Sequence, residues 1–179
     1  MRPIRLYEPS DPSYLFYLSL FLLFLQRVLG SLEALLDRER AWKVLLIEDD
    51  DDSAEAVVAL LGLYGIETLW AADGPSALMA LDSIRRLGES PPDFVLLDVN
   101  LPNTDTIALG HELRSHQIAA PIVLVSASSP DILESAAREI GAVASLRKPF
   151  SGDSLVAILL QYGPVDGAVP LNLRAAAPR

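Results

Sequence analysis

Five polar side chains of this sequence lie at or just after the ends of short apolar runs: Glu48, Asp49, Asp98, Ser126 and Lys148. Apolar runs of four or five residues, bounded by polar residues and proline or glycine, are typical of strands covered on both faces of a parallel sheet. The carboxyl ends of such strands share one edge, where α/β sheets bind their ligands. We therefore expect these five side chains to face one crevice.

This combination of groups suits phosphoryl transfer. Three clustered carboxylates repel one another, so a divalent cation is their natural neutraliser, and oxygen ligands favour Mg²⁺ or Mn²⁺ over zinc. The backbone carbonyl of Asn100 could supply a further ligand. Asp98 could then attack a phosphoryl group as the nucleophile. Ser126 would donate to a phosphoryl oxygen, and Lys148 would offset its negative charge.

Each residue also has a simpler interpretation when it is taken alone. The acidic stretch 48–52 could be a solvated turn at a helix N-terminus, where the helix dipole favours acids. Asp98 and Ser126 could be ordinary turn or cap residues. Lys148 could be a surface lysine, although the sequence has only one other, Lys43. Four strand ends that carry compatible groups favour a site. Both histidines, His111 and His116, are interpreted as surface or packing residues.

The elements that would position these residues alternate regularly along the chain. We expect strands at residues 44–47, 66–71, 94–97, 122–125 and 143–146. Helices are expected at residues 53–64, 73–87, 106–116, 131–140 and 154–162. Five repeats of strand and helix predict an α/β fold with one parallel sheet and helices on both faces. Residues 163–179, rich in alanine and proline, are predicted to form a flexible tail.

Composition narrows the function classes. The chain of 179 residues has no cysteine, which excludes a disulfide framework and a thiolate metal site. The formal charge of −10 disfavours nucleic-acid binding, which needs a cationic surface. Residues 1–42 carry equal numbers of acidic and basic residues, so the negative charge belongs to residues 43–179.

Three interpretations compete for the helical extension at residues 1–42. The apolar run 14–25 is about 18 Å long as a helix, too short for a bilayer core of about 30 Å, but it could anchor the chain at a membrane surface. A dimerising or partner-binding helix over residues 12–40 would explain an unbroken leucine heptad. A secretory signal would explain Arg2 and Arg5 before an apolar core, but no small-residue cleavage site follows. The heptad leucines are Leu15, Leu18, Leu22, Leu25, Leu29, Leu32 and Leu36.

Four short motifs follow one another along the chain: residues 43–50 (KVLLIEDD), 98–102 (DVNLP), 125–127 (VSA) and 147–150 (RKPF). Together they closely resemble the response-regulator receiver domain of two-component signalling. The resemblance covers about residues 43–162. It implies a flavodoxin-like, doubly wound five-stranded parallel sheet in the order 2-1-3-4-5. It also implies a Mg²⁺ site at Glu48, Asp49, Asp98 and the Asn100 carbonyl, with Ser126 and Lys148 as the family's hydroxyl and lysine, and a cis bond before Pro149.

Two positions depart from the family pattern. Ser145 stands three residues before Lys148, where the family usually has an aromatic switch residue. Thr106 follows Asp105, where the family usually has glycine. The first departure questions the usual coupling between Ser126 and a buried ring, and the second predicts a different path for the loop after Pro102.

The sequence therefore predicts a non-enzymatic, stand-alone phospho-acceptor receiver at residues 43–162. Its partners would be a sensor histidine kinase or phosphotransfer protein and a downstream protein, and its location would be cytoplasmic, because the kinase and its ATP are cytosolic. The rival hypothesis is a receiver fold that docks or dimerises without phosphorylation, which Ser145 favours. An aspartyl phosphatase is disfavoured because such enzymes typically need a second aspartate two residues after the nucleophile, where this chain has Asn100.

Overall fold

The computed structural model describes residues 18–19, 21–28, 41–116, 119–164, 169 and 173. The chain divides into two units, Met1–Arg40 and Ala41–Arg179, and each is considered by itself. In the first unit, residues 18–19 and 21–28 are helical. The second unit carries the sheet and all of the predicted site residues.

The sheet of the second unit has five parallel strands: β1 (Lys43–Ile47), β2 (Glu67–Ala71), β3 (Phe94–Asp98), β4 (Ile122–Ser126) and β5 (Ala144–Arg147). Their spatial order is β2-β1-β3-β4-β5. The chain thus crosses to the other side of β1 after β2. The predicted α/β class and the flavodoxin-like order are confirmed.

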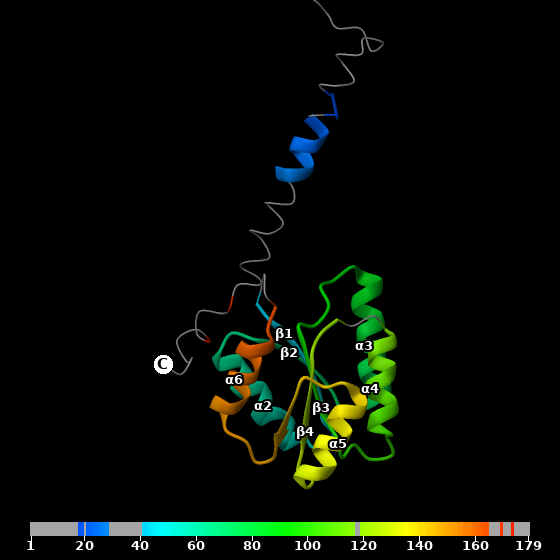
Figure 1. Ribbon diagram of the computed structural model, residues 1–179, viewed down its shortest axis with the longest axis vertical. Helices are drawn as coiled ribbons and strands as arrows, with labels where there is room; N and C mark the ends of the chain where they lie inside the picture. The colour runs from blue at the N-terminus through cyan, green and yellow to red at the C-terminus, as the bar shows by residue number, and fades with distance from the viewer. Residues whose placement is uncertain are drawn as a thin grey trace, which may run out of the picture. The chain divides into compact units, whose positions relative to one another are not determined.

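Five helices follow the strands: α2 (Asp51–Leu63), α3 (Gly74–Leu87), α4 (Thr106–Ser115), α5 (Pro130–Ile140) and α6 (Gly152–Tyr162). Helices α3, α4 and α5 cover one face of the sheet, and α2 and α6 cover the other (Figure 1). All ten predicted elements of this unit are present, with bounds that differ by no more than two residues at either end.

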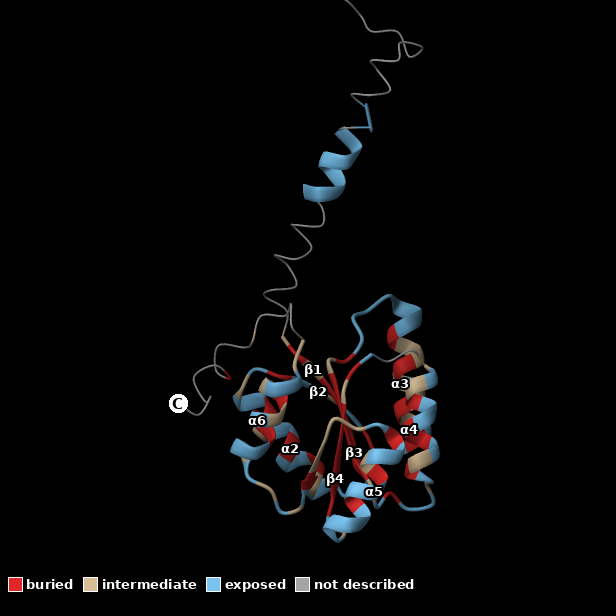
Figure 2. Cartoon of the chain, viewed as in Figure 1, coloured by how far each residue is buried: buried red, intermediate tan, exposed pale blue. Residues whose placement is uncertain are grey.

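Two apolar layers enclose the sheet, as the buried colouring of the strands indicates (Figure 2). Alternate residues of β3 enter opposite layers, Val95 and Leu97 on the side of α3–α5, and Phe94 and Leu96 on the side of α2 and α6. All four are fully buried. Central strands packed on both faces make a rigid platform for the residues that follow them.

Short side chains begin most of these helices at the carboxyl edge of the sheet. Asp50, Asp73 and Ser151 accept hydrogen bonds from backbone N–H groups of α2, α3 and α6. Such N-caps satisfy donors that have no partner within the helix. In the acidic stretch after β1, Asp50 is therefore the N-cap of α2, whereas Glu48 and Asp49 do not cap this helix.

The ends of the chain are only partly described. In the predicted tail, Leu173 is fully buried in the layer beside α2 and α6, and Val169 packs against that layer. These two residues do not fit a loose tail, and the rest of the tail lies outside the described residues. Of the leucine heptad, Leu15, Leu29, Leu32 and Leu36 also lie outside them.

Candidate functional site

The carboxyl edge of the sheet brings the predicted acidic residues together. Glu48 and Asp49 follow β1, and Asp98 is the last residue of β3. One carboxylate oxygen from each of the three lies within 4.8 Å of the others. Glu48 and Asp98 are buried, at 2% and 5% exposure, whereas Asp49 is exposed. The cluster therefore opens to solvent on the side of Asp49.

Lys148 reaches into this cluster from the segment after β5. Its Nζ lies 2.5 Å from Glu48 Oε2 and 2.6 Å from Asp98 Oδ2. Burial by itself would lower the pKa of Lys148, but the hydrogen bonds to Asp98 and Glu48 and the negative charges of these residues together raise that pKa. Burial raises the pKa of Glu48, and the hydrogen bond from Lys148 opposes this change. Lys148 is thus held as an ammonium between two buried carboxylates.

The donor set fits a hard divalent cation. One ammonium faces three carboxyl groups, so negative charge remains at an edge that is open to water. The ligand atoms are oxygens within reach of a common centre, which suits Mg²⁺ better than zinc. Glu48, Asp49 and Asp98 would hold the ion. The contribution of the Asn100 carbonyl stays a prediction.

A hydrogen-bonded group of Asn100, Ser126 and Ser128 lies next to Asp98. The Asn100 N–H donates to Asp98 Oδ1 at 2.7 Å, and the Asn100 side-chain amide donates to Ser126 Oγ at 2.9 Å. The Ser128 N–H also donates to Ser126 Oγ, at 3.0 Å, and the Ser128 hydroxyl donates to Asn100 Oδ1 at 3.0 Å. Ser126 Oγ therefore accepts two bonds, which leaves its own proton available for donation.

The segment after Asp98 accommodates the unusual Thr106. The Thr106 hydroxyl donates to the Val99 carbonyl at 2.9 Å, and Asp105 accepts from two N–H groups to begin α4. Asn103 has a positive φ of 54°, a conformation that asparagine tolerates better than most residues. Thr106 therefore closes this loop onto the segment that carries Asp98, a role that its sequence position did not reveal.

Near the fifth strand, one family expectation is confirmed. The Lys148–Pro149 bond is cis. Ser145, at the position of the usual aromatic residue, lies within β5 and is half-buried.

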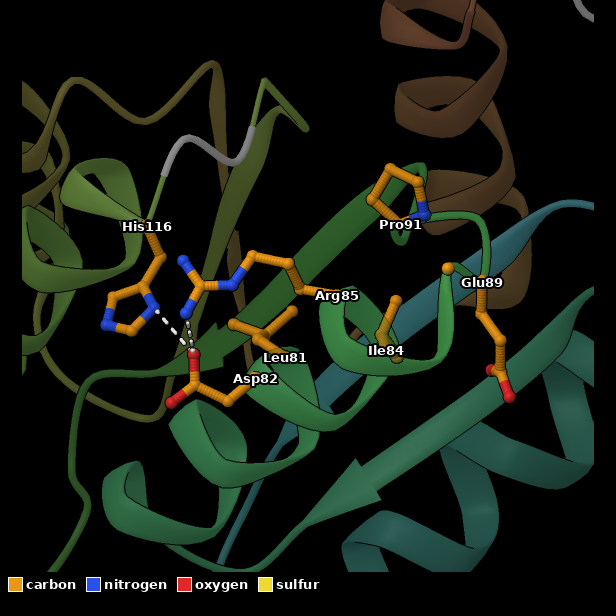
Figure 3. Close-up of a pocket in the computed structure, with 8 residues that line it drawn as sticks. Leu81, Asp82, Ile84, Arg85, Glu89, Pro91 and His116 are labelled. Atoms are coloured by element: carbon orange, nitrogen blue, oxygen red, sulfur yellow. Dashed lines mark hydrogen bonds and ion pairs between the residues drawn. The ribbon is translucent and has the colours of Figure 1, made fainter.

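Two of the hollows in the described part of this unit lie near residues discussed above. One, of about 430 Å³, adjoins the site between α2 and the segment 148–150, and Lys148 contributes to its wall. The other, of about 330 Å³, lies at the C-terminal end of α3 (Figure 3). There Asp82 Oδ1 lies 3.0 Å from Arg85 Nη2 and 3.5 Å from His116 Nδ1. His116 thus links the end of α4 to α3, in agreement with its predicted packing role.

Comparison with known proteins agrees with this fold and site. A family model described as the response regulator receiver domain matches residues 44–160. The chain belongs to this family. Receiver domains are signalling domains that generally bind Mg²⁺ at an acidic pocket and interact with histidine kinases or phosphotransfer proteins.

Curated relatives of this receiver are longer proteins. Regulatory protein AtoC of Escherichia coli K12 is 31% identical over 113 residues, which cover 63% of this chain and 23% of AtoC. Transcriptional regulatory protein YxdJ of Bacillus subtilis is 35% identical over 115 residues, 64% of this chain and 47% of YxdJ. The chain therefore spans about half, or less, of the length of these relatives.

Among solved structures, this receiver resembles proteins of its own domain size. A response regulator receiver protein from Burkholderia phymatum superimposes with a TM-score of 0.60 at 26% identity, over 69% of this chain and 99% of that chain. Chemotaxis protein CheY4 of Vibrio cholerae gives a TM-score of 0.58 at 25% identity, with the same coverage.

Proposed function

We propose that this receiver is a phospho-acceptor: Asp98 takes a phosphoryl group from the phosphohistidine of a sensor kinase or phosphotransfer protein. The observation that carries this proposal is the Asp98 carboxylate itself, buried at the end of β3, 2.6 Å from Lys148 and clustered with Glu48 and Asp49. A carboxylate in such a cluster is disposed for nucleophilic attack on phosphorus, with positioning and charge neutralisation as the main sources of rate.

Each neighbour of Asp98 has a role in this transfer. The Asn100 N–H and the Lys148 ammonium hold one carboxylate oxygen each, which fixes the plane of the nucleophile. An Asp98 oxygen bonds to phosphorus as the phosphorus–nitrogen bond breaks, and the electron pair returns to the imidazole. Lys148 offsets the charge of the new acyl phosphate, and the Ser126 hydroxyl donates to one of its oxygens. Bound Mg²⁺ would neutralise the charge of the approaching phosphoryl oxygens.

The phosphorylated form would act by binding rather than by turning over a separate substrate. Charge added at Asp98 would change the contacts of Ser126, the last residue of β4, and of Lys148, the first residue after β5. The surface around those strands would then be read by a downstream protein. Because the donor kinase uses ATP, we propose a cytoplasmic location.

The N-terminal helix would bind either a second copy of the chain or a membrane surface. Its described leucines and phenylalanines are exposed, for example Phe21 at 57%, Leu22 at 52% and Phe24 at 64%. No helix among the described residues is long and apolar enough to cross a membrane. We propose that the segment pairs with a second copy through residues 12–40 or lies on a membrane surface through residues 14–25. Deleting residues 1–40 should convert a dimer to a monomer in sedimentation, or else abolish co-flotation with phosphatidylcholine vesicles.

Intact-mass analysis with a small acyl-phosphate donor tests the main proposal. Wild-type protein should gain one phosphoryl group in the presence of Mg²⁺, and the gain should disappear with EDTA or with Asp98→Asn. A folded wild-type protein that never gains mass would contradict the proposal and favour a receiver fold that docks without phosphorylation.

A further inference from the structure

Trp70 makes a hydrogen bond to the backbone of Glu48, and the proposed phosphotransfer does not use this bond. It lies in β2, at the edge of the sheet, and is 41% exposed. Its indole Nε1 donates to the backbone carbonyl of Glu48 at 2.8 Å. The side chain of Trp70, on an edge strand, thus forms a hydrogen bond with Glu48, the first residue of the acidic segment.

This bond is made where the regular ladder stops. The register of β1 with β2 ends at the pair Ile47 and Ala71. One residue further, the Glu48 N–H still donates to the Ala71 carbonyl at 3.1 Å. The indole then supplies a donor to the Glu48 carbonyl. Both peptide groups of Glu48 are therefore tied to β2, one by backbone and the other by a side chain.

The orientation of the Glu48 side chain depends on that backbone. The side chain is only 3% exposed, and its Oε2 accepts from Lys148 at 2.5 Å. Asp49, the next residue, contributes the exposed oxygen of the cluster. A small rotation of the peptide between these residues would move both carboxylates, and an ion such as Mg²⁺ demands near-ideal octahedral geometry.

We infer that Trp70 is a positioning residue for the divalent cation: its indole N–H holds the Glu48–Asp49 peptide so that both carboxylates converge with Asp98. This inference rests on the proposed Mg²⁺ site. Groups that orient metal ligands typically change metal affinity by about 10- to 100-fold when they are removed. Because Trp70 acts on backbone rather than on a ligand atom, we expect the lower end, about tenfold.

Two substitutions separate the hydrogen bond from the packing of the ring. Trp70→Phe keeps an aromatic ring and removes the donor. Trp70→His keeps a five-membered ring whose Nε2 is as many bonds from Cβ as the indole Nε1. Tyr162→Phe is the matched control, since it removes one polar atom from a half-exposed aromatic ring at the far end of α6.

Mg²⁺ affinity of the full chain would be measured by isothermal titration calorimetry at about pH 8, where histidine is neutral. Thermal unfolding in EDTA would report on the fold without the ion. Trp70→Phe should bind Mg²⁺ about tenfold more weakly, Trp70→His should recover most of the affinity, and Tyr162→Phe should match wild type.

Equal Mg²⁺ affinity for wild type and Trp70→Phe would overturn the inference. An equal loss in Trp70→Phe and Trp70→His would also overturn it, because it would assign the effect to the ring. If Trp70→Phe fails to fold, the comparison of wild type with Trp70→His decides: a tenfold loss there refutes a role for the N–H. If wild type binds no Mg²⁺, the proposed metal site fails, and this inference fails with it.

Discussion

Lys148→Met tests the electrostatic core of the site. The substitution keeps an unbranched apolar stem and removes the ammonium that lies 2.5 Å from Glu48 and 2.6 Å from Asp98. The side chains of the two acids are 3% and 6% exposed, so water cannot replace the lost donor well. Without Mg²⁺, the folded protein must then bury two carboxylates beside each other.

The expected cost follows from this burial. Removing one partner of a buried ion pair typically costs about 3–5 kcal/mol. The side chain of Lys148 is itself 22% exposed, and the cluster opens to solvent at Asp49, so we expect about 3 kcal/mol. For a domain of this size, such a loss lowers the melting temperature by roughly 10 °C.

Mg²⁺ should reverse part of this loss. The cation and the ammonium neutralise the same carboxylates, so Mg²⁺ should bind the variant more tightly than wild type. A tenfold gain in affinity would return about 1.4 kcal/mol at saturating Mg²⁺. Lys43→Met is the matched control, because Lys43 is the only other lysine and lies at the opposite end of β1. Its effect should stay within about 0.5 kcal/mol.

Urea unfolding at about pH 8, in EDTA and in excess Mg²⁺, measures these quantities. Burial raises the pKa of Glu48, so the pH of the measurement is set well above the ordinary range of a carboxyl group. Lys148→Met as stable as wild type in EDTA would refute the electrostatic account. A variant destabilised equally with and without Mg²⁺ would show that the ammonium and the ion do not share carboxylates.

Two further predictions concern the fold around the site. In α4, a Cβ on Gly110 would lie 2.5 Å from Ile140 Cγ2 of α5, so Gly110→Ala should lower the free energy of unfolding by about 1–3 kcal/mol. In α2, a Cβ on Gly62 would meet open space, so Gly62→Ala should raise the free energy of unfolding by about 0.5 kcal/mol. Urea unfolding measures both changes. Hydrogen bonds from the side chain and the N–H of Ser76 hold the pKa of Asp73 below its ordinary value. The ionised Asp73 therefore stabilises the fold at any pH above the pKa of aspartate in the unfolded chain. This stabilisation is lost as the pH falls through the pKa of Asp73 in the folded protein. Asp73→Asn, which caps α3 without titrating, should flatten this part of the acid-unfolding curve, and an unchanged curve would count against the cap.

Much of the architecture could be predicted because its signals are local. Short apolar runs such as residues 94–97 predict strands, and Asp73 before Gly74-Pro75 predicts the start of a helix. The order of the strands did not come from these patterns; it followed from the resemblance to receivers. Within the predicted tail, Leu173 is buried in the apolar layer beside α2 and α6. The residues next to a leucine in the sequence do not indicate whether its side chain will pack against a distant part of the fold.

The sequence by itself determined which side chains stand at the strand ends and therefore which chemistry the edge supports. Residue type and strand direction suffice for that, because parallel strands deliver their carboxyl ends to one edge. Only the tertiary structure decided which hydrogen bonds hold the site in place. Trp70 donates to the Glu48 carbonyl, and Thr106 donates to the Val99 carbonyl. The side chain of Asn100 donates to Ser126 and accepts from Ser128. These bonds depend on register and on backbone direction after each strand, which arise when distant segments pack and are not encoded in any short stretch of the chain.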